Sequence, residues 1–501
     1  MSRKLLLRSI GTLEIAREFR DPVYNYIHVT NFENDTIDSR VFQRLDGLSQ
    51  MPTAHFVYPS GEYSRKTHSL GAMHLMSKAI LHILYLHSDQ LRQEISPLLF
   101  GESVVYRVDR DKGLDHLDQM NYNSWWDSKG LDEIVQYSRL AALLHDIGHA
   151  PFSHTFEDLT KELKAKGDID EEFDHEKMSR EIIIEKEGEL GLGDFEGKEI
   201  VGILDKKGEA PEFLKELISG PCDCDKLDYL MRDSHHVGAP EYGSIDADRI
   251  IDGFRVKNLR LCISSSAIHA VMNSFRAVQS MYTAIYYHRA SRVFDFMIAD
   301  ALSKVPEFIQ EITSSVDEFL KYDDHSIICA IRERAQGTDF ITKKYKEAKE
   351  LLDKVKYREK TYKNILEFPL SFPLAVKQEA QEDIEKAVDE FRKIVEEEEI
   401  TDFNFRYDYR PAIRPVGINL DEIIDWLRSP RIYDTTDNTV TKLEDKYLAY
   451  FRDLIRYSIL FRIFVDRKKS EEYPHKIERI KEKVEIELDK LEEKWTKMML
   501  P

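Results

Sequence analysis

Apolar residues recur at helical spacing in two long segments of the chain. In THSLGAMHLMSKAILHILYLH they line one face, as in an amphipathic helix. Over residues 131–147, a second stripe of Tyr137, Leu140 and Leu144 precedes Gly148, and glycine commonly follows the end of a helix. Both segments are therefore predicted to be helices.

Shorter patterns predict the remaining elements. The other predicted helices are 38–50, 196–233, 268–320 and 441–498. The predicted strands are 23–29 and 256–264, and residues 401–418 are predicted to form strands or an extended arm. Residues 101–130 show no period and are expected to form a loop or insertion, and FPLSFPLAV is expected to break a Lys- and Glu-rich segment. The fold class is predicted to be mainly α, with a few short strands and a helical C-terminal region.

The charge balance limits the classes of partner. The chain has 501 residues, of which 33% are charged, and its formal net charge is −20. A broad basic surface for nucleic acid is therefore not indicated, although a local basic patch stays open. An anionic substrate would need nearby Lys, Arg or metal to overcome the negative field of the protein.

Cysteine content and hydropathy bear on the compartment. Four cysteines in so long a chain argue against a disulfide framework and fit a reducing, cytoplasmic environment. The N-terminal segment lacks the long apolar core and small-residue cleavage site of a signal peptide. No uncharged stretch of about 18 residues occurs, so no transmembrane helix and no membrane partner are expected.

Ionisable side chains gather at the end of the second predicted helix, in RLAALLHDIGHAPFSH. His145 and Asp146 are adjacent, and adjacent helical side chains diverge by about 100°, but both can reach an ion beside the helix terminus. His149 follows one turn later, and His154 returns after a proline turn. Taken alone, this cluster fits a set of hydrogen-bonded core histidines better than a metal site.

Two distant segments change that balance. RKTHSLG places His68 at the start of one predicted helix, and DCDKLDYLMRD places Asp225 at the start of another. Together with the His-Asp pair they form a mixed nitrogen and oxygen set, which suits Fe, Mn, Zn or Mg rather than a thiolate-bound ion. An ion so held keeps open positions for water and a phosphate oxygen.

The ordered motifs HDIGHAPFSH and DCDKLDYLMRDSHHVG, preceded by His68, resemble the HD-domain superfamily of metal-dependent phosphohydrolases. Within it, they are most similar to the deoxynucleoside triphosphate triphosphohydrolase branch. The resemblance covers about residues 15–310 and implies an HD-domain helical core. It also implies attack at the α-phosphorus of a dNTP, with release of deoxynucleoside and intact triphosphate.

The resemblance assigns roles to eight residues at the reaction centre. The implied metal ligands are His68, His145, Asp146 and Asp225. The implied catalytic residues are His149, His154, His175 and Glu157. His154 is expected to protonate the leaving 5′ oxygen, and Glu157 stands where the family usually has Asp, which puts the orientation of its partner histidine in question.

The resemblance also implies substrate and activator contacts. The expected substrate residues are Gln50 and Asp233 at the 3′ hydroxyl, Arg65 and Lys226 at the phosphates, Tyr286 under the sugar, and Tyr229. Asp38 and Gln43 match residues that read a guanine activator, but Asp46 replaces a stacking Arg, and a helix-cap role for Asp38 with a surface Gln43 is an equal alternative. Val278 and Tyr282 replace a family Arg and His near the phosphates, which leaves the fine substrate preference open.

These expectations define a two-part protein. An HD phosphohydrolase domain is expected over 1–320, followed by a mostly helical region with a short β segment over 321–501 that serves regulation or oligomerisation. The expected cofactors are a divalent metal and additional Mg carried by the nucleotide. The expected partners are a nucleotide substrate, a nucleotide activator and further copies of the chain, as a dimer or tetramer. Two alternatives stay open, namely another HD phosphohydrolase, such as a nuclease or a hydrolase of other nucleotides, and a non-enzymatic nucleotide-binding sensor.

Overall fold

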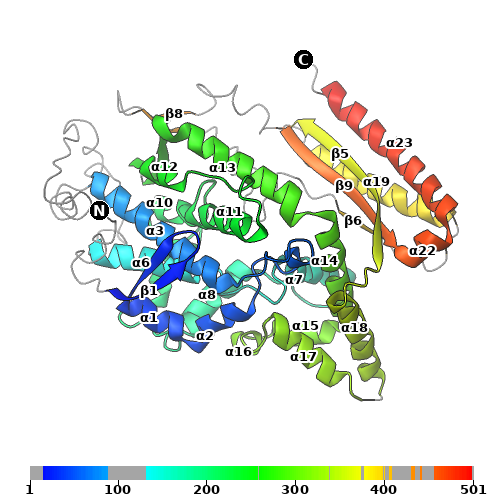
Figure 1. Ribbon diagram of the computed structural model, residues 1–501, viewed down its shortest axis with the longest axis horizontal. Coiled ribbons are helices and arrows are strands. Elements are labelled where there is room, and N and C mark those ends of the chain that lie inside the picture. Colours follow the sequence, from blue (N-terminus) through cyan, green and yellow to red (C-terminus); the bar gives the residue numbers. More distant parts are fainter. Residues whose placement is uncertain are drawn as a thin grey trace. The chain divides into compact units, whose positions relative to one another are not determined.

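The computed structural model (Figure 1) describes residues 15–87, 131–257, 259–337, 339–373, 377–398, 400, 405–408, 430–434, 440–442 and 456–498. The loop expected over 101–130 and most of the extended segment over 401–418 lie outside these ranges. The chain forms two compact units, the first from 1–277, 306–330 and 421–446 and the second from 278–305, 331–420 and 447–501. Each unit is therefore assembled from separate segments of the chain.

The first unit is mainly helical, as predicted. Its helices are α1 Asn31–Asp38, α2 Arg40–Gln43, α3 Arg65–His87, α6 Leu131–Leu144, α7 His154–Lys166, α8 His175–Glu185, α9 Gly197–Leu204, α10 Glu212–Glu216, α11 Cys224–Val237, α12 Ala247–Asp252, α15 Pro306–Ile312 and α16 Val316–Phe319. Helices α13 Ile268–Met281 and α17 Asp324–Arg334 continue from this unit into the second. A hairpin of β1 Ile15–Asp21 and β2 Asn25–Thr30 and a sheet of β3 Phe254–Lys257, β4 Arg260–Ser264, β7 Pro430–Tyr433 and β8 Val440–Lys442 complete it.

Helix α3 is the centre of this unit. It packs against α6 and α11, and its predicted apolar stripe is buried. Residues on the other faces of α3 are buried as well: Ala72, Leu75, Met76, Ala79 and Ile83. A helix that is covered on most sides belongs to the interior of a domain, so the functional groups at its start are held by a rigid element.

The loop after α6 is fastened by hydrogen bonds from three directions. The amide of Gly148 donates to Ser179 Oγ at 2.9 Å, and Ser179 Oγ donates to the carbonyl of His145 at 2.7 Å. Nη2 of Arg44 donates to the carbonyl of His149 at 2.9 Å. The carboxylate of Asp324 accepts from the amide of Phe152 at 2.7 Å, so the loop that carries the histidines has a defined path.

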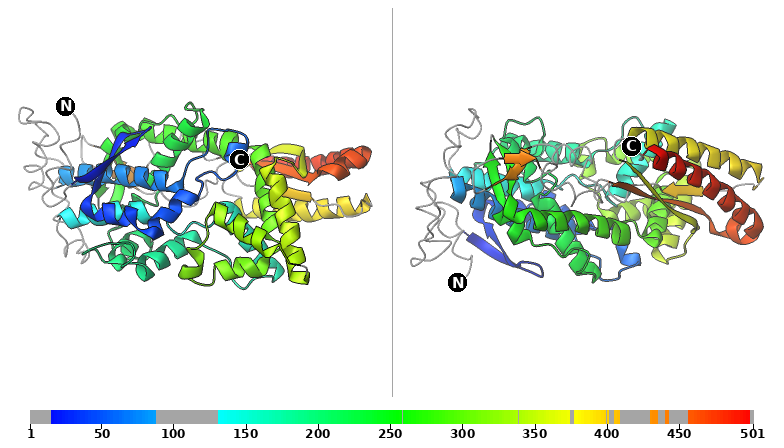
Figure 2. Two further views of the ribbon diagram at one scale, coloured as in Figure 1. Left: turned by 60° about the horizontal axis from the view of Figure 1, so that its bottom comes forward. Right: turned by 90° about the horizontal axis from the view of Figure 1, so that it is seen from above.

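The second unit contains more β structure than predicted. Its elements are α14 Arg289–Leu302, α18 Phe340–Lys356, α19 Lys377–Glu397, α22 Arg467–Glu472, α23 Pro474–Met498, and the antiparallel sheet β5-β9-β6 of Tyr362–Pro373, Arg456–Asp466 and Phe405–Asp408. Helices α19 and α23 pack against each other, and α23 also packs against β5. In Figure 2, α19 is yellow and α23 is red. Of the residues that the structure describes, 441–442 and 456–466 are strand, so the helical prediction over 441–498 is wrong there. Residues 368–373 of FPLSFPLAV belong to strand β5, which separates the helices α18 and α19.

The physical reason lies in the pattern of β9. Residues Phe461–Val465 are all buried, and all are apolar except Arg462, so the strand lacks the alternation of apolar and polar residues that would have indicated it. In β5, Pro369 lacks an N–H group, but β5 is an edge strand of the sheet, where a proline is tolerated. Across the part of the chain that the structure describes, no helix is both long and apolar enough to cross a membrane.

Gly148→Ala is predicted to destabilise the protein. An added Cβ would lie 2.2 Å from the amide nitrogen of Ser179 and 2.4 Å from the carbonyl oxygen of His175. Both are backbone atoms of α8. Since backbone cannot swing aside as a side chain does, the loss of unfolding free energy in urea should be about 1–3 kcal/mol.

Gly188→Ala is the matched control, because a Cβ there meets nothing within 4 Å. Its stability should stay within about 0.5 kcal/mol of the wild type. Equal stability of the two variants would contradict the close contact between α8 and the loop.

Candidate metal centre

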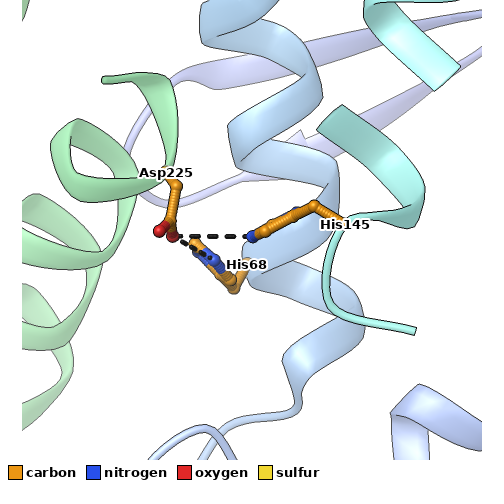
Figure 3. Close-up of side chains that lie close together, drawn as sticks. All are labelled: His68, His145 and Asp225. Carbon is orange, nitrogen blue, oxygen red and sulfur yellow. Dashed lines mark ion pairs between the residues drawn. The ribbon is translucent and has the colours of Figure 1, made fainter. Parts of the chain in front are cut away.

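Three side chains from distant segments meet in the first unit (Figure 3). His68 lies in the first turn of α3, His145 directly after α6, and Asp225 in the first turn of α11. Nε2 of His68 lies 3.0 Å from Oδ1 of Asp225, and Nε2 of His145 lies 3.5 Å from the same oxygen. The three donor atoms are therefore close enough to share one ion.

Asp146 adjoins the same cluster. Its Oδ1 lies 3.3 Å from Nε2 of His145, and its Oδ2 lies 3.7 Å from Nε2 of His68. Oδ2 also accepts a hydrogen bond of 2.6 Å from Nη1 of Arg65. The structure thus brings all four predicted ligands together, with Asp146 shared between the cluster and a buried arginine.

The hydrogen bonds of the two histidines fit a cation. Nδ1 of His145 lies 2.9 Å from the carbonyl of Ala142, and Nδ1 of His68 lies 2.8 Å from Oδ2 of Asp228. With Nδ1 as the donor, each Nε2 carries a lone pair, and both Nε2 atoms are buried without a hydrogen bond of acceptable geometry. Two imidazole nitrogens and carboxylate oxygens, with the outer ring nitrogens engaged, form a donor set that suits Fe, Mn, Zn or Mg.

The carboxylates in and around the cluster also favour a positive charge there. Burial alone would favour neutral His68, but the carboxylates of Asp225 and Asp228 raise its pKa to about 10. Burial opposes ionisation of Asp225 too, yet His145 and His68 lower its pKa. A divalent cation would take the place of the proton that these carboxylates favour.

A second group of histidines is organised by Glu157. Its Oε2 lies 2.9 Å from Nδ1 of His154, and its Oε1 lies 2.5 Å from Nδ1 of His175. The ring of His149 stacks on that of His175 with centroids 4.0 Å apart, and its Nε2 lies 3.3 Å from Oδ1 of Asp146. The four predicted catalytic residues are thus contiguous, and the longer carboxylate of Glu157 reaches two histidines at once.

The surroundings of His149 and His154 shift the pKa values of both rings. Burial and the nearby Arg65 lower the pKa of His149 well below the ordinary range, so its ring is neutral at pH 7. Burial also lowers the pKa of His154, although Glu157 opposes this effect. The side chain of His154 is 35% exposed, so with Nδ1 held by Glu157 its Nε2 is the nitrogen that can meet a ligand.

The two predicted phosphate-binding cations are buried and paired. Nε of Arg65 donates to Ser153 Oγ at 3.1 Å while Nη1 binds Asp146. Nζ of Lys226 donates to Oδ2 of Asp223 at 2.6 Å. Both cations border residues of the cluster, and a phosphate would have to compete with these carboxylates for them.

Two of the predicted sugar-binding residues adjoin one tyrosine. The backbone amide of Gln50 donates to the backbone carbonyl of Tyr63 at 2.9 Å. The hydroxyl of Tyr63 donates to a carboxylate oxygen of Asp233. Oε1 of Gln50 is buried without a hydrogen-bond partner among the described atoms. The ring of Tyr229 lies with its centroid 6.4 Å from that of His68, so Gln50, Asp233 and Tyr229 all belong to the first unit.

Of the other predicted contacts, Asp38 and Gln43 belong to the first unit and Tyr286 to the second. Tyr286 lies in the second unit, in a π-helical turn where its ring meets Tyr282 at 4.8 Å. Asp38 does not cap a helix, because it is the last residue of α1 and pairs with Arg17 of β1 at 2.8 Å. Gln43 is half-buried, and its Nε2 donates to the carbonyl of Ile37 at 2.6 Å.

The carboxylates behind the cluster were not among the predicted site residues. Asp228 binds Nδ1 of His68, and Asp324 accepts from the amides of Ser49 and Phe152 at 2.9 and 2.7 Å. Asp228 stands four residues before Arg232 on α11, a spacing that places both on one helical face. That spacing, together with the need of a metal-binding histidine for a partner at its other nitrogen, is a signal that could have found Asp228.

Comparisons with known proteins agree with these motifs. The HD domain family matches residues 123–230, and the HD associated region matches residues 245–407. The chain is 29% identical over 317 residues to an uncharacterized protein of Methanocaldococcus jannaschii, which covers 62% of this chain and 54% of that protein. It is 27% identical over 314 residues to the deoxynucleoside triphosphate triphosphohydrolase SAMHD1 homolog of Dictyostelium discoideum, covering 61% and 52% respectively. The chain thus spans about half the length of these relatives.

Solved structures share the fold. A hypothetical protein from Aquifex aeolicus superimposes with a TM-score of 0.60 at 22% identity, over 94% of this chain and 99% of that one. A phosphohydrolase from Bacteroides thetaiotaomicron gives a TM-score of 0.59 at 21% identity, over 90% and 99%. At these identities the similarity supports the fold alone.

His145→Ala and Asp146→Ala are each predicted to lose the bound divalent metal. Each substitution removes a donor from the cluster, and the affinity should fall by more than the roughly 10–100-fold typical of losing an outer hydrogen-bond partner. The measurement is metal content by mass spectrometry after loading and desalting. Glu157→Gln, outside the cluster, should keep its metal, and wild-type metal content in Asp146→Ala would remove Asp146 from the ligand set.

Metal affinity is predicted to rise with pH. Because neighbouring carboxylates raise the pKa of His68 to about 10, this ring holds a proton near neutrality that metal binding must release. The apparent affinity should increase by about tenfold per pH unit for each proton released. Calorimetry between about pH 6 and 8, in buffers of different ionisation enthalpy, measures both quantities, and a pH-independent affinity would contradict the prediction.

Proposed function

The chain belongs to the HD-domain superfamily, and from this premise we propose that it is a metal-dependent phosphohydrolase that converts deoxynucleoside triphosphates to deoxynucleoside and triphosphate. One arrangement of side chains supports the proposal most directly. His68, His145 and Asp225 aim three donor atoms at one point, and Asp146 links that point to the histidines held by Glu157. A cation site beside a positioned acid–base group is what hydrolysis of a phosphate ester requires.

The residues around the cluster would each have a defined task. A bound divalent cation would lower the pKa of water and neutralise phosphate charge. Arg65 lies within reach of the same region through Asp146, and would offer a guanidinium to a phosphate oxygen. Glu157 orients His154 through Nδ1, so that Nε2 can protonate the leaving oxygen. The negative charge of a bound triphosphate would raise the pKa of His154 and favour its protonated form.

The choice of a deoxynucleotide substrate rests on two kinds of support. Relatives named deoxynucleoside triphosphate triphosphohydrolase SAMHD1 occur in Dictyostelium discoideum and, at 26% identity over 433 residues, in Homo sapiens. In this chain, the backbone amide of Gln50 and the carboxylate of Asp233 both bond to Tyr63, and Oε1 of Gln50 is buried without a partner among the described atoms, which supports a polar ligand such as the 3′ hydroxyl of a sugar. The coarser assignment, an HD-domain phosphohydrolase, does not depend on either.

The proposal extends to a nucleotide activator and to assembly as a homo-oligomer, a dimer or tetramer. The second unit carries a local cluster of positive charge. Burial together with Arg358, Arg467 and Arg289 lowers the pKa of Lys360, so four cationic side chains gather there. Such a cluster favours an anionic ligand, of which an activating nucleotide is one example.

The proposed reaction predicts two products. Pure, metal-loaded protein is incubated with each dNTP and each NTP, and the products are separated by ion-exchange chromatography. Each dNTP should yield free deoxynucleoside and intact triphosphate. The control is Asp225→Ala, which removes a ligand of the cluster and should yield neither product.

Other products would select the alternatives. Nucleoside monophosphate or cleavage of oligonucleotides would indicate another HD phosphohydrolase. Nucleotide binding without turnover in the metal-loaded protein would indicate a sensor. Either result would overturn the triphosphohydrolase assignment.

Tyr286→Ala is predicted to narrow the ratio of kcat/KM for a dNTP to that for the matching NTP. If Tyr286 packs against the 2′ carbon, a ribose hydroxyl is buried there without a partner, at a cost of about 1–3 kcal/mol, or roughly tenfold in selectivity. Tyr357→Ala is the control, because that tyrosine is 67% exposed. An unchanged ratio in a folded Tyr286→Ala protein would remove this residue from the site.

A further inference from the structure

The carboxylate of Asp228 lies directly behind His68. Its Oδ2 lies 2.8 Å from Nδ1 of His68, and both side chains are almost fully buried. Arg232, one turn further along α11, donates to both oxygens, from Nε to Oδ2 at 3.0 Å and from Nη2 to Oδ1 at 2.9 Å. This bidentate pair fixes the plane of the carboxylate.

The turn of the N-terminal hairpin reaches the same pair. The hydroxyl of Tyr24 donates to Oδ1 of Asp228 at 2.8 Å, and Nη1 of Arg232 donates to Oδ2 of Asp21 at 2.6 Å. Oδ1 of Asp21 in turn accepts from the amides of Val23 and Tyr24 at 2.8 and 2.9 Å. The hairpin β1–β2 packs against α1 and α3 (Figures 1 and 2), and its turn is tied to α11 by these bonds.

Every acceptor position of Asp228 is occupied. Oδ1 accepts from Tyr24 and Arg232, and Oδ2 accepts from Arg232 and His68. A carboxylate offers about four such positions, so this one cannot rotate without breaking a buried hydrogen bond.

Close packing confines the group further. Gly71 of α3 faces it so closely that a Cβ at that position would lie 1.9 Å from Oδ1 of Asp228 and 2.3 Å from Nη2 of Arg232. The carboxylate therefore has no room to move toward α3 and offers His68 one orientation only.

We propose that Asp228, held by Arg232 and by the hairpin-turn residues Asp21 and Tyr24, is a positioning residue that keeps Nε2 of His68 directed at the metal. The hairpin is then a part of the metal centre, although none of its residues touches the ion. The inference rests on the proposed function only in that the cluster binds a divalent cation. The alternative to this inference is that these hydrogen bonds only hold the hairpin against α11 and do not affect metal binding.

Co²⁺ serves as the probe, because its absorption spectrum reports ligand geometry as well as binding. Asp228→Asn keeps the shape of the side chain but replaces one acceptor oxygen with a donor. We expect Co²⁺ affinity, measured by competition with a chelator, to fall about 10–100-fold, with an altered spectrum.

Tyr24→Phe is the sharper variant, since it removes one hydroxyl and keeps the ring that stacks on His74 at 4.7 Å. The affinity for Co²⁺ should fall roughly two- to tenfold, as expected for the loss of one hydrogen bond to a charged group. Tyr26→Phe, in the same hairpin with a side chain 40% exposed, should match the wild type. Should Asp228→Asn not fold, Tyr24→Phe against Tyr26→Phe decides the question.

Unchanged affinity and spectrum in Tyr24→Phe, with a lowered melting temperature, would overturn the inference and leave the proposed function intact. Failure of the wild-type protein to bind Co²⁺ would overturn the proposed function and the inference with it. Weaker binding with an altered spectrum in Tyr24→Phe, beside an unchanged Tyr26→Phe, would support the positioning role.

Discussion

The structure of the first unit depends on one buried imidazole between two carboxylates. Nε2 of His68 faces Asp225 at 3.0 Å and Nδ1 faces Asp228 at 2.8 Å, and these two acids are three residues apart on α11. For both contacts to exist, α3 and α11 must pack closely at that level, which is why Gly71 meets Asp228 without room for a side chain. An unpaired buried charge would be costly, so the position of one ring constrains two helices and a hairpin.

The histidine loop shows how the remaining site is kept rigid. Phe152 and Ser153 both have positive φ angles, 59° and 53°, which are unfavourable for residues other than glycine. Hydrogen bonds from Arg44 to the loop and from the loop to Asp324, with the packing of α8 against Gly148, offset that cost. Strain of this kind is stable only where the surroundings over-determine the conformation, and here it brings His154 back beside Glu157.

The distribution of charge would allow this acidic chain to bind an anionic substrate. The net charge is −20, yet the cations nearest the cluster are buried and already paired, Arg65 with Asp146 and Lys226 with Asp223, each at 2.6 Å. Pairing lets them remain charged in the interior without a ligand. A phosphate would exchange one anionic partner for another, so its binding need not create new buried positive charge.

The local sequence determined the helices that carry the ligands, because the apolar stripes of α3 and α6 and the motifs at their ends are short-range patterns. It also indicated the mixed nitrogen and oxygen donor set. Only the tertiary structure decided that Asp228 stands behind His68, that Glu157 reaches two histidines, and that 456–466 forms a strand of a sheet. These features join residues up to 160 positions apart, and such contacts follow from packing and from the pairing of buried polar groups, which no local periodicity encodes.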